Sequence, residues 1–189
     1  MRLGILGSTR GTNLLQIIHA IQQKTLFAEI AVILSNKQEA LILEKGRMHN
    51  VPSFFIDPAG LTREAYDAAL TAILKEHAVD VVVLIGYMRI LSADFVARWQ
   101  HRIINIHPSL LPKHAGLMDL AVHQSVLDAG DSETGCTVHY VEEEVDSGPI
   151  LLQKKCKVSS TDTAEMLKQR VQALEGDALV QAINLLIKA

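Results

Sequence analysis

Five consecutive branched apolar residues, Val-Val-Val-Leu-Ile at positions 81–85, constrain the fold of this chain more than any other stretch. They leave no polar face, so a strand made of them has to be covered on both sides. Such strands are typical of the centre of a parallel sheet in an α/β protein. With 189 residues, of which 49% are hydrophobic and 21% charged, the chain is long and apolar enough to build that core.

The first half of the chain alternates short apolar runs with stretches of helical periodicity, which predicts a parallel sheet built from βαβ units. Two later runs, at residues 136–141 and 149–158, are joined by a turn too short for a crossover helix, so they should pair antiparallel. We therefore predict an α/β fold: a Rossmann-like, mostly parallel sheet flanked by helices, with an antiparallel C-terminal strand pair, in a single domain of residues 1–189. The remaining strands are expected at residues 2–6, 30–34, 53–56, 79–85 and 103–107, and helices at 12–23, 40–49, 62–77, 92–99, 121–129 and 163–187.

Residues of the kind that cap helices stand before four of these helices. Thr12, Thr62 and Ser92 can each accept a hydrogen bond from a free N–H of the first turn. Asp162, with Glu165 three residues later, resembles a capping box. We expect these residues to set where the helices begin.

The stretch Ile-Ile-Asn-Ile-His-Pro at residues 103–108 places two polar side chains at the end of a strand. Alternation puts Asn105 and His107 on one face, and Pro108 then removes a backbone donor and ends the ladder. Ligands of open α/β sheets bind at the carboxyl ends of strands. An amide donor therefore stands beside a general acid or base, although two polar residues that merely satisfy a loop would give the same pattern.

The loop at residues 7–11 begins and ends with glycine and leads from the first strand into the first helix. Backbone N–H groups and the helix dipole at such a point can bind an anion. The loop is neither GxGxxG nor a Walker A loop, and no acidic residue follows the second strand to hold a ribose. An anion site and an ordinary tight turn both remain open.

Composition excludes several classes of function. A net charge of −3 gives no reason to expect a nucleic-acid-binding surface. Cys136 and Cys156 form no CxxC pair, and the histidines show no HExxH spacing, so the spacing gives a metal site no support but leaves it open. No apolar stretch resembles a signal peptide or could span a bilayer. We expect a cytoplasmic protein without a membrane partner.

Several motifs together resemble the folate-dependent formyltransferase family over nearly the whole chain. The most specific is Asn-x-His-Pro-Ser-Leu-Leu-Pro at residues 105–112, followed by Asp-Ser-Gly-Pro at 146–149. Gly-Thr-Asn at 11–13 is similar to the family's phosphate loop, Met-Arg-Ile-Leu at 88–91 to its folate-side segment, and residues 172–175 to a segment that helps hold a nucleotide. Thr9-Arg10 departs from the family pattern, and the segment 116–123 is slightly longer than in some relatives.

The resemblance implies direct acyl transfer of a formyl group from the co-substrate 10-formyltetrahydrofolate to a primary amine. At 189 residues, the chain is not expected to carry the extra domains of family members that act on methionyl-tRNA or deformylate the folate. It is therefore expected to formylate glycinamide ribonucleotide in de novo purine biosynthesis. The partners implied are these small molecules, with no metal and no nucleic acid, and a homodimer is an open alternative.

Residue roles follow from the same resemblance. Asn105, His107 and Asp146 match the family's catalytic residues. The residues expected to bind the nucleotide are Gly11, Thr12, Asn13, Gln172 and Glu175. Those expected to bind the folate are Arg63, Met88, Arg89, Ile90, Leu91, Val141, Glu142, Glu143 and Glu144.

Two other classes of function remain as alternatives. The same site could pass the formyl group to water as a formyltetrahydrofolate hydrolase, or to another amine. A non-catalytic folate- or nucleotide-binding protein is the second alternative, against which the trio of Asn105, His107 and Asp146 argues, because binding alone does not require it.

Overall fold

The computed structural model describes residues 1–188, which form two compact units. The first unit is Met1–Asn105 and the second begins at Ile106. That the chain is a single domain stays a prediction.

The first unit is a parallel sheet in the order β3-β2-β1-β4-β5. All four residues of β4 are buried, as the apolar run predicts for a strand covered on both faces. The strands are β1 (Arg2–Leu6), β2 (Glu29–Ser35), β3 (Ser53–Phe55), β4 (Val81–Leu84) and β5 (Ile103–His107), whose last residues lead into the second unit.

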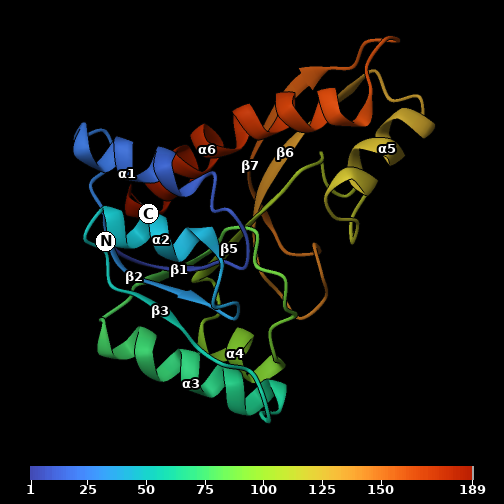
Figure 1. Ribbon diagram of the computed structural model, residues 1–189. Helices are drawn as coiled ribbons and strands as arrows, with labels where there is room; N and C mark the ends of the chain where they lie inside the picture. The colour runs from blue at the N-terminus through green and yellow to red at the C-terminus, as the bar shows by residue number, and fades with distance from the viewer. Residues whose placement is uncertain (189) are drawn as a thin grey trace. The chain divides into compact units, whose positions relative to one another are not determined.

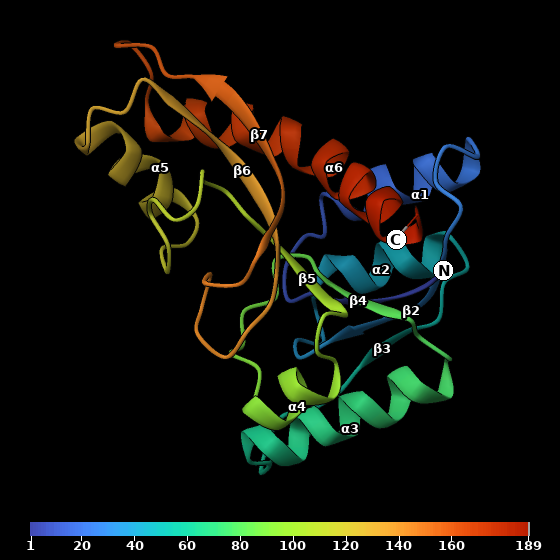
Figure 2. The same ribbon diagram turned by 180° about the vertical axis from the view of Figure 1, so that it is seen from behind.

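Four helices cover the two faces of this sheet (Figures 1 and 2). α1 (Leu14–Gln22) and α2 (Leu41–Met48) lie on one face, while α3 (Arg63–Glu76) and α4 (Ala93–Arg98) lie on the other. The second unit contains the antiparallel pair β6 (Glu133–Tyr140) and β7 (Ile150–Lys157). Its long helix α6 (Ala164–Lys188) packs along both strands, and α5 (Leu120–Asp128) packs against α6. The predicted mostly parallel α/β fold with an antiparallel C-terminal strand pair is confirmed.

Two of the predicted caps are confirmed and two are wrong. The Thr62 side chain accepts from the N–H of Ala65, and Ser92 accepts from Phe95. Thr12 caps nothing, because α1 begins after Asn13 and the N–H of Leu14 donates to the carbonyl of Gly11 instead. Asp162 is bound by Arg170, and Thr163 accepts from the N–H of Met166 in its place.

Candidate active site

β5 ends in the two polar residues that the sequence singled out. Ile103 and Ile104 are buried, Asn105 is half-buried, and His107 is only 4% exposed. An imidazole this deeply buried needs partners for its ring nitrogens, because an unpaired polar atom away from water is costly.

The first partner of His107 is Asp146. Its Oδ2 lies 3.1 Å from Nδ1 of His107, and both side chains are nearly buried. Asp146 stands in the turn between β6 and β7 with φ of 57°, a left-handed conformation that Asp tolerates better than most residues. A Cβ on Gly148 would lie 1.9 Å from the carbonyl oxygen of Tyr140, so the Asp-x-Gly pattern reflects space as well as chemistry.

The second partner of His107 is a backbone group. Its Nε2 lies 3.1 Å from the carbonyl oxygen of His114. A carbonyl and an ionised carboxylate only accept hydrogen bonds, so the two contacts are both satisfied when the imidazole is a cation. Burial lowers the pKa of His107, whereas the Asp146 carboxylate and the His114 carbonyl act to raise it; burial prevails, and the pKa lies below its ordinary value.

Asp146 is held from three sides. The N–H of Gly116 donates to Oδ2 at 2.8 Å, and Nε2 of the buried His139 lies 3.6 Å from Oδ1. Burial by itself would raise the pKa of Asp146, but hydrogen bonds from His139 and Gly116 and the charge of His107 bring it below the usual value. The carboxylate is therefore ionised at neutral pH.

Hydrogen bonds to one threonine fix the loop that follows His107. Thr137 of β6 donates to the carbonyl of Ser109 at 2.7 Å and accepts from the N–H of Leu111 at 3.0 Å. Gln153 donates to the same hydroxyl and to the carbonyl of Leu111. The Ser-Leu-Leu-Pro part of the motif is thus tied to the hairpin that carries Asp146.

In the first unit, Ser8 joins the glycine loop to the segment 88–91. Its buried hydroxyl donates to Asn36 and accepts from the N–H of Met88 at 2.9 Å. Gly11 has φ of 58°, and a Cβ there would lie 2.4 Å from Ile42, so no larger residue fits without rearrangement. Thr12 is half-buried and Asn13 only 5% exposed.

The residues predicted on the folate side of the first unit differ in exposure. Arg63 is the exposed first residue of α3. The guanidinium of Arg89 lies 4.5 Å from the ring centre of Tyr66, and Arg89 Nε has no hydrogen-bond partner among the described residues. Met88 and Ile90 are exposed, while Leu91 is buried.

The other predicted binding residues belong to the second unit. Gln172 and Glu175 lie half-buried on α6, and Glu175 is close enough to Cys136 to help raise the pKa of its thiol, which burial mainly sets, to about 12. Val141 is half-buried in the turn that carries Asp146, and the acidic residues after it are exposed: Glu142, Glu143 and Glu144. The structure thus brings His107 and Asp146 into direct contact and distributes the remaining residues over the two units.

Three residues at the site were missed in the sequence. Ser8 acts through a contact with Met88, far along the chain, His139 through a contact with Asp146 across the turn that follows β6, and His114 through its backbone carbonyl, which touches His107. His139 carried one usable signal, because it is a titratable residue next to the end of the strand that leads into the turn of Asp146. The described side chains contain no group of three or more metal-ligating residues.

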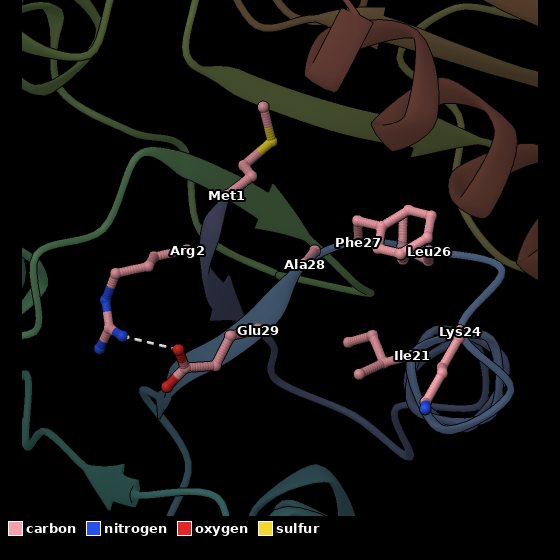
Figure 3. Close-up of a pocket in the computed structure, with 8 residues that line it drawn as sticks. All are labelled: Met1, Arg2, Ile21, Lys24, Leu26, Phe27, Ala28 and Glu29. Carbon is pink, nitrogen blue, oxygen red and sulfur yellow. Dashed lines mark hydrogen bonds and ion pairs between the residues drawn. The ribbon is translucent and has the colours of Figure 1, made fainter.

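A surface cavity of about 390 Å³ lies beside the amino ends of β1 and β2, away from the glycine loop and residues 88–91 of the first unit. Arg2 and Glu29 form an ion pair at one side, and Phe27 and Lys24 stand at the other (Figure 3). Parallel sheets place ligands at the carboxyl ends of their strands, where the glycine loop and residues 88–91 follow β1 and β4. We therefore do not assign this cavity to the active site.

Comparison with known proteins identifies the family. The formyl transferase family profile matches residues 1–183. The chain belongs to the formyl transferase family. No helix in the part of the chain that the structure describes is long and apolar enough to cross a membrane.

Three relatives show how this family member compares with others. It is 41% identical to phosphoribosylglycinamide formyltransferase of Escherichia coli (strain K12), over 93% of this chain and 82% of that protein. It is 43% identical to the trifunctional purine biosynthetic protein adenosine-3 of Drosophila pseudoobscura pseudoobscura, over 98% of this chain but only 14% of that protein's length. The structure matches that of glycinamide ribonucleotide transformylase 1 from Symbiobacterium toebii with a TM-score of 0.94 and 39% identity, over 100% of this chain and 88% of the other.

Proposed function

We propose that this formyl transferase moves a formyl group from 10-formyltetrahydrofolate to the amine of glycinamide ribonucleotide, a step of de novo purine biosynthesis. The observation that carries the proposal is the buried contact between His107 and Asp146, in a chain 41% identical to phosphoribosylglycinamide formyltransferase of Escherichia coli. Acyl transfer to an amine places negative charge on the formyl oxygen and needs a proton for the departing nitrogen, and a cationic imidazole can serve either need.

His107 is proposed as the donor. Its Nε2 faces the neutral carbonyl of His114 at 3.1 Å, and an oxygen that gains charge is a stronger acceptor than that carbonyl. A lowered pKa makes the imidazolium a stronger acid, at the cost of a smaller cationic fraction at neutral pH. Asn105, two residues earlier on the same face of β5, can donate through its amide without changing charge.

Asp146 is proposed to keep His107 charged and oriented. An ionised carboxylate 3.1 Å away favours the imidazolium, and its own low pKa makes it a weak base. We therefore propose that Asp146 acts mainly by stabilising the charge of His107. The proton of the attacking amine is then taken up by water. No step requires a covalent link between the protein and the formyl group.

Binding roles complete the proposal. We propose that the N–H groups and side chains of Gly11, Thr12 and Asn13 hold the substrate phosphate, and that Gln172 and Glu175 bind its neutral donors. The folate is assigned to the remaining residues that match the family pattern: Arg63, Met88, Arg89, Ile90, Leu91, Val141, Glu142, Glu143 and Glu144. We expect the protein to act in the cytoplasm without a metal, and a homodimer stays an open alternative.

The proposal is tested by supplying formyltetrahydrofolate with glycinamide ribonucleotide and following both products. Formylated nucleotide and deformylated folate should appear in equal amounts. Glycinamide riboside, which lacks the phosphate, should show a much lower kcat/KM, because a remote phosphate both binds the substrate and positions its amine. Folate product without formylated nucleotide would indicate a hydrolase, and equal kcat/KM for both acceptors would reject the phosphate site at residues 11–13.

A further inference from the structure

Residues 114–116 contact both members of the proposed catalytic pair through backbone atoms. The carbonyl of His114 lies 3.1 Å from Nε2 of His107, and the N–H of Gly116 donates to Asp146 at 2.8 Å. A side chain can change its rotamer without moving its neighbours, but a backbone group moves only with its segment. The position of residues 114–116 therefore sets the geometry of the pair.

The side chain of His114 fixes this segment at both of its ring nitrogens. Nδ1 lies 2.7 Å from the hydroxyl of Ser125 on α5, and Nε2 lies 2.9 Å from Oδ2 of Asp131 in the turn between α5 and β6. The side chains of His114 and Asp131 are only 10% and 13% exposed. Two directional contacts at opposite edges of a buried ring leave it little freedom to rotate or slide.

Asp131 provides a permanent charge for this anchor. Hydrogen bonds from Lys113 and His114 hold the pKa of Asp131 below its usual value, so its carboxylate is ionised at neutral pH. The side chain of Lys113 is 65% exposed, so its contact with Asp131 is screened by solvent. The His114 side chain is nearly buried and links the Asp131 carboxylate directly to the segment 114–116. The stronger restraint on the segment thus passes through His114.

We propose that His114 and Asp131, with Ser125, are positioning residues that hold the backbone of residues 114–116 against His107 and Asp146. This inference rests on the proposed function and deepens it: the substrates are not expected to touch the His114 imidazole, which acts through the segment that carries it. Misplacing a catalytic group by about 1 Å can cost on the order of a hundredfold in rate.

The test replaces the anchor and measures both kinetic constants. Asp131→Asn and Ser125→Ala keep the size of the side chain or nearly so, and His114→Ala removes the ring. Each should lower kcat, by on the order of ten- to a hundredfold for Asp131→Asn and His114→Ala, while KM for both substrates changes by less than about threefold. Asp177→Asn, which breaks the exposed pair with Lys154 in the same unit, is the control and should leave kcat within about twofold.

A second readout separates positioning from a general loss of folding. The titratable groups around His107 are Asp146, His114, His139 and His123. Loosening the His114 carbonyl removes an influence that raises the pKa of His107, so NMR titration of the His107 ring should show a lower midpoint in Asp131→Asn than in the unmodified protein. Partial unfolding would reduce the amount of active enzyme without moving that midpoint in the folded fraction.

A lowered kcat with a lowered His107 midpoint supports the inference. An unchanged kcat, a change in KM alone, or an unmoved midpoint in Asp131→Asn overturns it. If the unmodified protein does not formylate glycinamide ribonucleotide, the proposed function fails, and the NMR titration still decides whether the anchor controls His107.

Discussion

Replacing Asp146 by Asn removes a charge beside His107 while preserving the shape of the turn. Asn has the same size, tolerates the left-handed backbone found at this position, and offers an oxygen to the N–H of Gly116. What it cannot do is stabilise an imidazolium by charge. The substitution therefore isolates the electrostatic contribution of the carboxylate.

The size of that contribution follows from the geometry. Two unit charges 3.1 Å apart interact by about 5 kcal/mol at an effective dielectric constant of about 20. Since burial and solvent already offset part of this energy, a more realistic measure is the shift of about 1–3 pKa units that an opposite charge this close produces. The pKa of His107 should fall by that amount in Asp146→Asn, and kcat near neutral pH should fall by about tenfold to a thousandfold.

The assay is kcat at saturating concentrations of both substrates, measured from about pH 5 to about pH 8, where imidazoles titrate. In the unmodified enzyme, kcat should decline as pH rises, with a midpoint below the ordinary imidazole value of about 6.5 because burial lowers the pKa of His107. In Asp146→Asn the same decline should move to lower pH. A variant whose kcat falls while the midpoint stays in place would refute the reasoning, because another group would then be titrating.

Two further substitutions test other parts of the site. His107→Ala should lower kcat on the order of a hundredfold or more with little change in KM, as measured by steady-state kinetics, and near-normal turnover would remove His107 from the mechanism. Gly148→Ala should lower the free energy of unfolding by about 1–3 kcal/mol in urea titrations, because its Cβ would lie 1.9 Å from the Tyr140 oxygen. Ser147→Ala in the same turn is the control, expected within about 0.5 kcal/mol of the unmodified protein, and equal stability of the two variants would contradict the steric argument.

Much of the fold could be predicted because its signals are local. The apolar run of β4 and the alternation of β5 depend only on neighbouring residues, and the caps at Thr62 and Ser92 bind N–H groups three residues away. The cap assigned to Asp162 failed because a residue eight positions later, Arg170, binds its carboxylate. Helix-capping preferences consider only nearby residues, so they cannot predict that Arg170 binds the Asp162 carboxylate instead.

The site was less predictable because its contacts join residues that are separated in the sequence. Nothing in the spacing of His107 and Asp146 indicates that they meet; the expectation came from resemblance to a family, and the contact depends on how the hairpin of β6 and β7 folds. His114 was missed because its contact with His107 uses a carbonyl, which every residue has. Backbone contacts of this kind leave no mark on residue type.

The left-handed backbone at Asp146 narrows the mutational routes open to the catalytic turn. Asn and Gly suit the conformation but carry no charge, while Glu carries the charge on a longer stem and suits the conformation poorly. The two requirements have Asp as their one common solution. No single substitution at position 146 therefore meets both requirements. Another residue could replace Asp146 only after the turn had changed in length or path.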